Sequence, residues 1–163
     1  KDSMAMNLKS EVYRITCTLQ GKVINMHMSY LCAILEIPNE AGRPIDLMGD
    51  FDEVTTLKNL TRDDNYYPNY TANHLNVHSR LLHHYITYNI LPRIGHREII
   101  HTLDIFLINS ILMGKAINLG YILMTQMREA GSKKTGCLPY GMVLTRIFDH
   151  FEISLHDKSV KEK

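Results

Sequence analysis

The sequence predicts a mainly α-helical protein with a small β-hairpin near its N-terminus. In the C-terminal half, apolar residues recur at the three- and four-residue spacing of a helix face. Proline and glycine interrupt this pattern, which divides the half into about four helices with short connections, as in a bundle. Residues 11–28 instead interleave apolar and polar side chains, which is the pattern of paired strands.

Turn and cap signals place the first elements. Gln20 and Gly21 are expected to form the turn of a hairpin within residues 11–28. Ser29 is expected to cap a short helix over residues 30–35. Pro38 ends that helix, because the residue before a proline avoids the helical conformation.

The chain is expected to divide into three parts. Residues 1–74 hold the hairpin, the short helix and an irregular acidic region, which contains one further helix over residues 51–60. Residues 75–155 form a helical core domain, and residues 156–163 form a charged tail.

Four helices are expected in the core domain. They cover residues 77–90, 98–113 and 118–127, and the last begins with Pro139, whose missing N–H costs nothing in a first turn. The second is so apolar that we expect it to be central. The apolar stripe of the first consists of Leu81, Leu82, Tyr85, Ile86 and Ile90.

Composition and charge exclude several classes of protein. The 163 residues carry a net charge of +1, whereas a generic polyanion binder is strongly basic. The charge is uneven: residues 1–79 have 7 Lys/Arg against 10 Asp/Glu (−3), and residues 80–150 have 8 against 4 (+4). The longest apolar run, 105–113, is far shorter than the ~20 residues of a membrane span, so no membrane association is expected.

The cysteines favour a reducing compartment. Cys17, Cys32 and Cys137 are odd in number and widely spaced, which fits buried free thiols better than a disulfide framework. We therefore expect an intracellular protein, in the nucleus or the cytoplasm.

No catalytic, cofactor-binding or metal-binding residue is assigned from the sequence, and no cofactor is expected. The histidines lack the cysteine partners and spacings of a structural zinc site. An acidic cluster lacks the spacing of a calcium-binding loop. Its members are Asp46, Asp50, Asp52 and Glu53.

Asp104 is a carboxylate among apolar neighbours in the second predicted helix. A carboxylate in such a setting has to face solvent or find a partner. We expect a structural ion pair rather than a catalytic acid, with the partner drawn from Arg80, Arg97 and Arg146.

Basic residues near helix ends and turns are candidate contacts to nucleic acid, because helix termini and lysines commonly bind phosphates. The candidates are Arg93, Arg97, Lys115, Lys133, Lys134 and Arg146.

Several motifs between residues 75 and 155 resemble a plant domain family named for transposon proteins and associated with mobile elements. They include Arg80-Leu-Leu-His-His, Asn89-Ile-Leu-Pro-Arg and Leu138-Pro-Tyr-Gly-Met. The positions that carry the resemblance include Arg80, His83, His84, Pro92, Asp104, Asn118, Gly120, Tyr121, Pro139, Tyr140 and Gly141. The resemblance implies a plant source and an origin in a mobile element. It implies no activity and no catalytic residue.

Three functions are compatible with these features. The first is a non-enzymatic helical interaction module, derived from a mobile element, that binds a protein partner or a second copy of itself. The alternative is a nucleic-acid-binding accessory domain of a plant transposon or retroelement protein. A metal-dependent nuclease or transposase fragment is the third, and it requires distant carboxylates to converge.

Overall fold

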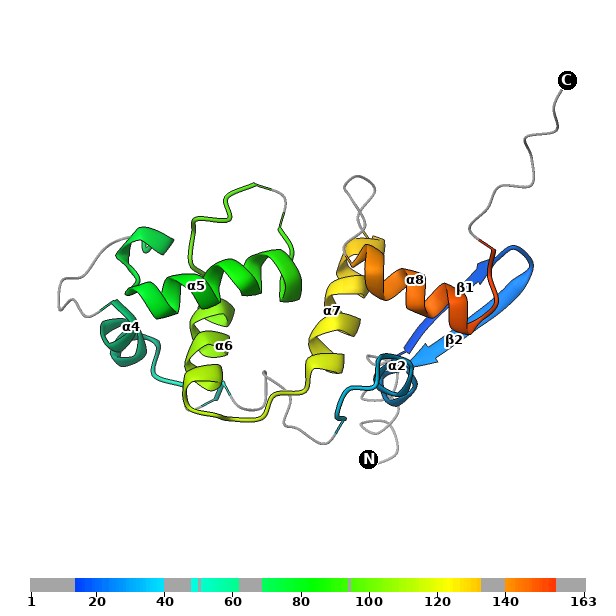
Figure 1. Ribbon diagram of the computed structural model, residues 1–163, viewed down its shortest axis with the longest axis horizontal. Coiled ribbons are helices and arrows are strands. Elements are labelled where there is room, and N and C mark those ends of the chain that lie inside the picture. The colour runs from blue at the N-terminus through cyan, green and yellow to red at the C-terminus, as the bar shows by residue number, and fades with distance from the viewer. Residues whose placement is uncertain are drawn as a thin grey trace, which may run out of the picture.

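The structure, a computed structural model, describes residues 14–39, 48–49, 51–61, 69–93, 95–132 and 140–154. In chain order the elements are β1 (Arg14–Leu19), β2 (Lys22–His27), α2 (Met28–Leu35), α4 (Glu53–Thr61), η1 (Ala72–His74), α5 (Val77–Tyr85), η2 (Ile86–Ile90), α6 (Thr102–Leu112), α7 (Leu119–Ser132) and α8 (Gly141–His150). Helices predominate and β1 pairs with β2, so the mainly α class with an N-terminal hairpin is confirmed (Figure 1). None of the described helices is both long and apolar enough to cross a bilayer.

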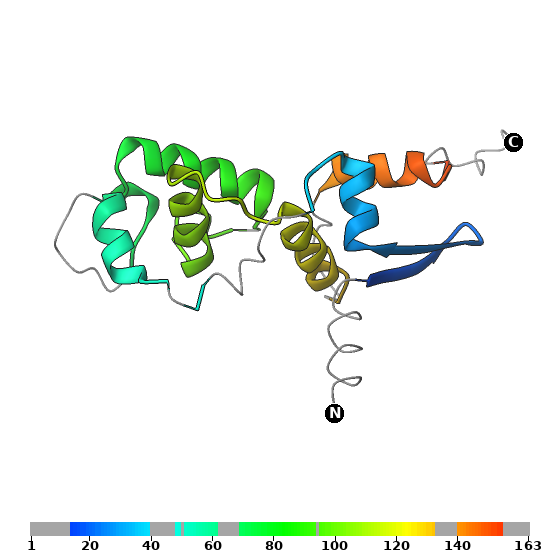
Figure 2. The same cartoon turned by 90° about the horizontal axis from the view of Figure 1, so that it is seen from below.

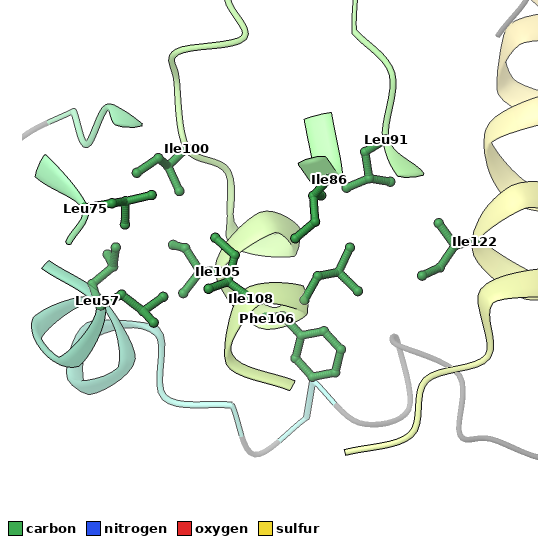
Figure 3. Packing of buried hydrophobic residues seen from close by; sticks show 11 residues of the cluster. Leu57, Leu75, Ile86, Leu91, Ile100, Ile105, Phe106, Ile108 and Ile122 are labelled. Atoms are coloured by element: carbon green, nitrogen blue, oxygen red, sulfur yellow. The ribbon is translucent and has the colours of Figure 1, made fainter. Parts of the chain in front are cut away.

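The elements gather in two lobes with α7 between them (Figures 1 and 2). One lobe contains α4, α5 and α6, and its core joins Leu57, Ile86 and Ile105 from different elements (Figure 3). The other lobe contains the hairpin, α2 and α8. Helix α7 contributes Ile122 to the first core and Leu123 to the second. The helices of the C-terminal half are therefore shared between two cores.

The second core joins the two ends of the chain. Ile24 of β2 and Leu31 of α2 are buried in the same cluster as Ile147 of α8. The hairpin therefore packs with the last helix. The division of the chain at residues 74 and 75 stays a prediction.

The hairpin turn forms where the sequence places it. Leu19 pairs with Lys22, which leaves Gln20 and Gly21 as a two-residue loop. Both loop residues have positive φ, 50° and 77°. This is the geometry of the tight turns that match the twist of paired strands.

The prediction that Ser29 caps α2 is wrong. The helix begins at Met28, directly after β2, so Ser29 lies in its first turn and His27 takes the cap position. The Ser29 hydroxyl lies 2.8 Å from the His27 ring Nδ1 instead. The helix ends at Leu35, before Pro38, because Glu36 takes a left-handed conformation with φ 58°.

The expected helices are present with shifted ends. Together α5 and η2 cover residues 77–90, and the last turn widens into a π-helix. Helix α6 begins at Thr102 rather than at residue 98, because Gly95 and His96 both have positive φ and Ile99 forms a bridge with Thr71. The expected start of the last helix at Pro139 lies outside the described residues.

Asn118 and Tyr140, two of the positions that carry the family resemblance, form polar contacts between elements that are distant in the sequence. Buried Asn118 accepts a hydrogen bond from the Tyr121 N–H at 2.9 Å, which caps α7, and its amide donates to the Asn39 carbonyl at 3.3 Å. The Tyr140 hydroxyl, next to α8, donates to the Ile90 carbonyl at the end of η2. Burial and the charge of Glu129 raise the pKa of the Tyr140 phenol, so it remains a donor.

At Gly120 helix α7 lies close to α2, because a Cβ atom there would be 2.3 Å from Cys32 Sγ. We expect Gly120→Ala to lower the free energy of unfolding by about 1–3 kcal/mol through overpacking. Gly131→Ala on the same helix is the matched control, since a Cβ there meets nothing within 4 Å. The control should be neutral or stabilising by up to about 1 kcal/mol. Urea denaturation of both variants measures the difference, and equal effects would contradict the close approach.

Candidate functional site

The buried face of α5 and η2 carries polar side chains together with part of the expected apolar stripe, since Leu82, Ile86 and Ile90 pack in the core of this lobe. Ser79 and His83 are almost fully buried, together with Ile86 of η2. Leu81 and Tyr85, which the sequence assigns to the stripe, are 66% and 57% exposed. The predicted stripe is therefore divided: Leu82, Ile86 and Ile90 face the core, whereas Leu81 and Tyr85 face solvent.

His83 lies against Asp104 of α6, whose carboxylate is completely buried. Asp104 Oδ1 lies 2.5 Å from Arg93 Nη2, and Oδ2 accepts the His101 backbone N–H at 2.9 Å. His83 Nε2 is 3.6 Å from Oδ2, which is longer than a normal hydrogen bond. The buried Asp104 carboxylate is therefore paired with an opposite charge, accepts a backbone N–H and lies near an imidazole ring.

The neighbours of Asp104 decide its protonation state. Burial alone would raise its pKa. The adjacent His83 ring, the hydrogen bonds from Arg93 and His101, and the Arg93 charge act in the opposite direction. The net result is a pKa below the ordinary value, so the carboxylate is ionised at neutral pH.

The expectation of an ion pair at Asp104 is met, but its partner was not among those named from the sequence. Arg80, Arg97 and Arg146 do not pair with it; Arg93 does. The connection between η2 and α6 folds back and brings Arg93 over the start of α6, where its Nη1 also donates to the Ile99 carbonyl at 3.3 Å. A partner eleven residues away depends on this loop path, which local patterns do not predict.

Ser79, His83 and Asp104 do not form a nucleophile arrangement. Ser79 Oγ is fully buried and makes no hydrogen bond with the described part of the chain, and the same holds for His83 Nε2. A serine that neither contacts a base nor reaches solvent has no access to a substrate. The three residues therefore pack the core of this lobe.

Within the described residues, no member of the acidic cluster contacts Asp104, whose carboxylate lies against Arg93, His101 and His83. Asp52 accepts hydrogen bonds from the Thr55 hydroxyl at 2.5 Å and from the Thr55 N–H at 3.1 Å, and so caps α4. These two hydrogen bonds lower the pKa of Asp52. Asp46 and Asp50 lie outside the described residues. Among residues 14–39, 48–49, 51–61, 69–93, 95–132 and 140–154, no group of three His, Cys, Asp or Glu could hold a metal ion.

A pocket of about 270 Å³ lies beside α5. Its walls include Arg80, His83 and His84 of α5, Tyr88 of η2, and Arg97 and Glu98 of the following loop. The Arg97 guanidinium lies 4.3 Å from the centre of the Tyr88 ring, and its Nε donates to the Arg93 carbonyl at 2.8 Å.

The candidate nucleic-acid contacts that the structure describes do not gather at one place. Arg97 lines the pocket, whereas Arg93 is engaged by Asp104. Lys115 follows α6. Arg146 of α8 is in the other lobe, where its Nη2 lies 3.8 Å from Glu36 Oε1. Lys133 and Lys134 lie outside the described residues. Arg80 joins Arg97 in the pocket lining, although the sequence indicated it only as a motif position and as a candidate partner of Asp104.

An exposed apolar stripe runs along α5 next to the pocket. Val77, Leu81 and Tyr85 are four residues apart, and each is more than half exposed: 58%, 66% and 57%. Residues at this spacing lie on one helix face. We call these three residues the α5 stripe.

No family model, curated protein or solved structure matches the chain. A function for this chain therefore has to be inferred from the arrangement of its residues.

The Asp104–Arg93 pair should dominate the acid stability of this lobe. Replacement by Asp104→Asn leaves Arg93 without its carboxylate and should cost about 2–4 kcal/mol at pH 7. The lowered pKa means that this stabilisation is present above the ordinary carboxyl pKa of 3.8 and is lost as pH falls through the lower folded-state pKa. The loss of stability on acidification should therefore be smaller in the variant than in the wild type.

Urea denaturation between pH 7 and pH 3 measures both effects. Asp149→Asn, at an exposed acid on α8, is the matched control and should change little. Equal pH profiles for the wild type and Asp104→Asn would contradict the assignment.

Proposed function

We propose that this chain is a non-enzymatic helical interaction module that binds a protein partner through α5. The observation that supports it most directly is the α5 stripe of Val77, Leu81 and Tyr85. Large apolar side chains in a continuous exposed row are typical of interaction sites. The same helix is held firmly by its buried face, so the stripe is presented on a rigid support.

The start of α5 is fixed independently of any partner. Asn76 Oδ1 accepts the Ser79 N–H at 3.0 Å, and its amide donates to the Leu60 carbonyl at 2.6 Å. The first interaction is an N-cap, and the second ties the cap to α4. A helix that is ordered before binding loses little conformational entropy on association.

The charges beside the stripe indicate what the partner carries. Helix α5 contains no Asp or Glu, and Arg80, His84 and His78 adjoin the stripe. An amphipathic helix with apolar residues three and four apart and acidic flanks would complement this surface in both shape and charge. Two antiparallel copies of α5 related by a twofold axis would bring their Arg80 edges together, so a second copy fits less well.

Origin and location belong to the same proposal. The origin in a mobile element rests on the resemblance of residues 75–155. The intracellular location is supported by Cys17 and Cys32, which are both free thiols. Cys17 is exposed, contrary to the expectation that the thiols are buried, and an exposed thiol persists more readily in a reducing compartment.

Selection from a library of displayed helical peptides tests the partner chemistry. Enriched peptides should carry apolar residues at helical spacing with Asp or Glu beside them. Their affinity should fall about tenfold or more for Leu81→Ser, because a buried leucine contributes about 1.5–3 kcal/mol. Fluorescence anisotropy with the synthetic peptides measures this.

Met142→Ser is the matched control for that experiment. Met142 is 85% exposed on α8 in the other lobe, so its loss should leave peptide affinity unchanged. Peptides that bind both variants equally well would contradict a site on α5. Light scattering over a range of concentrations tests whether two copies of the chain associate through α5. A dimer that Leu81→Ser abolishes would show self-association instead of binding to an acidic partner.

Nucleic-acid binding is the second candidate function, and the approach of Arg80 and Arg97 to one pocket favours it. If both contact phosphates, the affinity for a single strand should fall with salt with a log–log slope of about −0.7 per contact. Arg80→Gln should make that slope shallower by about 0.7. A shift assay at low salt measures the binding, and no detectable complex would contradict this function.

A further inference from the structure

The pocket beside the α5 stripe is slightly smaller than a typical ligand pocket. Its volume is about 270 Å³, below the ~300–1,000 Å³ of pockets that take drug-sized molecules. It lies on the edge of α5 formed by Arg80 and His84. A side chain that projects from a partner on the stripe could enter it.

Arg97 is prepared for an anion before any binds. Its Nε donates to the Arg93 carbonyl, and its guanidinium lies over the Tyr88 ring. These two contacts hold the planar group, while its terminal nitrogens make no hydrogen bond with the described residues. A held guanidinium with free terminal donors is suited to bidentate contact with an oxyanion.

Arg80 of α5 provides a second guanidinium to the pocket lining. Its side chain is exposed and forms no ion pair or hydrogen bond with the described part of the chain. Glu98 also lines the pocket and opposes an anion. Its side chain is 62% exposed, and its Oε1 lies 3.6 Å from His96 Nδ1, so solvent and the imidazole reduce that effect.

The buried carboxylate below the pocket does not cancel the two arginines. Asp104 is next to His83, which lines the pocket, but Arg93 already balances its charge. The pocket lining therefore has a net positive charge, because the two guanidinium groups of Arg80 and Arg97 outweigh the single carboxylate of Glu98.

We propose that this pocket binds a phosphate group on a phosphorylated side chain of the partner helix that lies on the α5 stripe. A phosphorylated serine or threonine carries about −1.5 to −2 charges. It therefore balances two guanidinium groups more completely than a carboxylate does, which carries a single charge. The adjacent apolar row favours a peptide over a nucleic acid, because a nucleic acid makes no use of Val77 and Leu81. The identity of the carrier rests on the proposed function, whereas the phosphate site itself does not.

The test titrates the isotope-labelled full chain with O-phosphoserine, with inorganic phosphate, and with chloride at equal ionic strength. Backbone amide shifts of His84, Arg97 and Glu98 should saturate with both phosphates and not with chloride. Arg80→Gln should weaken that binding about tenfold. Arg146→Gln, which removes a guanidinium from the other lobe, should leave it unchanged.

Leu81→Ser separates this proposal from the proposed function. Phosphate shifts should survive in that variant even though peptide binding is lost. Shifts that do not saturate, or that Arg146→Gln weakens as much as Arg80→Gln, would overturn the site. A phosphoserine peptide with the selected apolar residues is compared with a short single-stranded oligonucleotide. If the oligonucleotide saturates the same amide shifts at a lower concentration than the peptide, the proposal that a protein carries the phosphate is overturned.

Discussion

The buried carboxylate of Asp104 is the constraint on which the α4–α5–α6 lobe depends. A charge that is removed from water must be balanced by partners at fixed positions. Arg93 and the His101 N–H satisfy it, and each lies in the connection between η2 and α6. The connection is thereby folded over the start of α6. His83 completes the surroundings from α5, which explains why this helix buries a histidine together with part of its apolar stripe.

The same constraint extends to the surface. Arg93 uses its guanidinium inside the lobe and its backbone carbonyl outside, where it accepts the Arg97 Nε–H. Arg97 then lies over Tyr88, and the Tyr88 ring lies 4.3 Å from that of His84. A continuous series of contacts thus leads from a buried carboxylate to the wall of an open pocket. The pocket is built from the same loop that the ion pair holds.

Features that depend on nearby residues could be predicted from the sequence, and features that depend on distant ones could not. The turn at Gln20 and Gly21 and the extent of α5 with η2 follow from neighbours in the chain. The partner of Asp104 depends on the path of a loop with two residues at positive φ. The predicted stripe of α5 and η2 is right for Leu82, Ile86 and Ile90 and wrong for Leu81 and Tyr85. The buried position of His83 depends on Asp104 of another helix, which a local pattern does not show.

The surface of α5 depends on how its apolar residues are divided between the core and solvent. A helix normally buries its most apolar face, because that maximises the apolar area removed from water. In α5 and η2 the apolar residues are divided: Leu82, Ile86 and Ile90 pack in the core that holds Asp104, and Val77, Leu81 and Tyr85 form the α5 stripe. The stripe and the pocket thus lie on the helix whose inner side contacts the Asp104 cluster. A change in that cluster would alter both the rotation of α5 and the position of Arg97, so the core and the proposed interface are not independent.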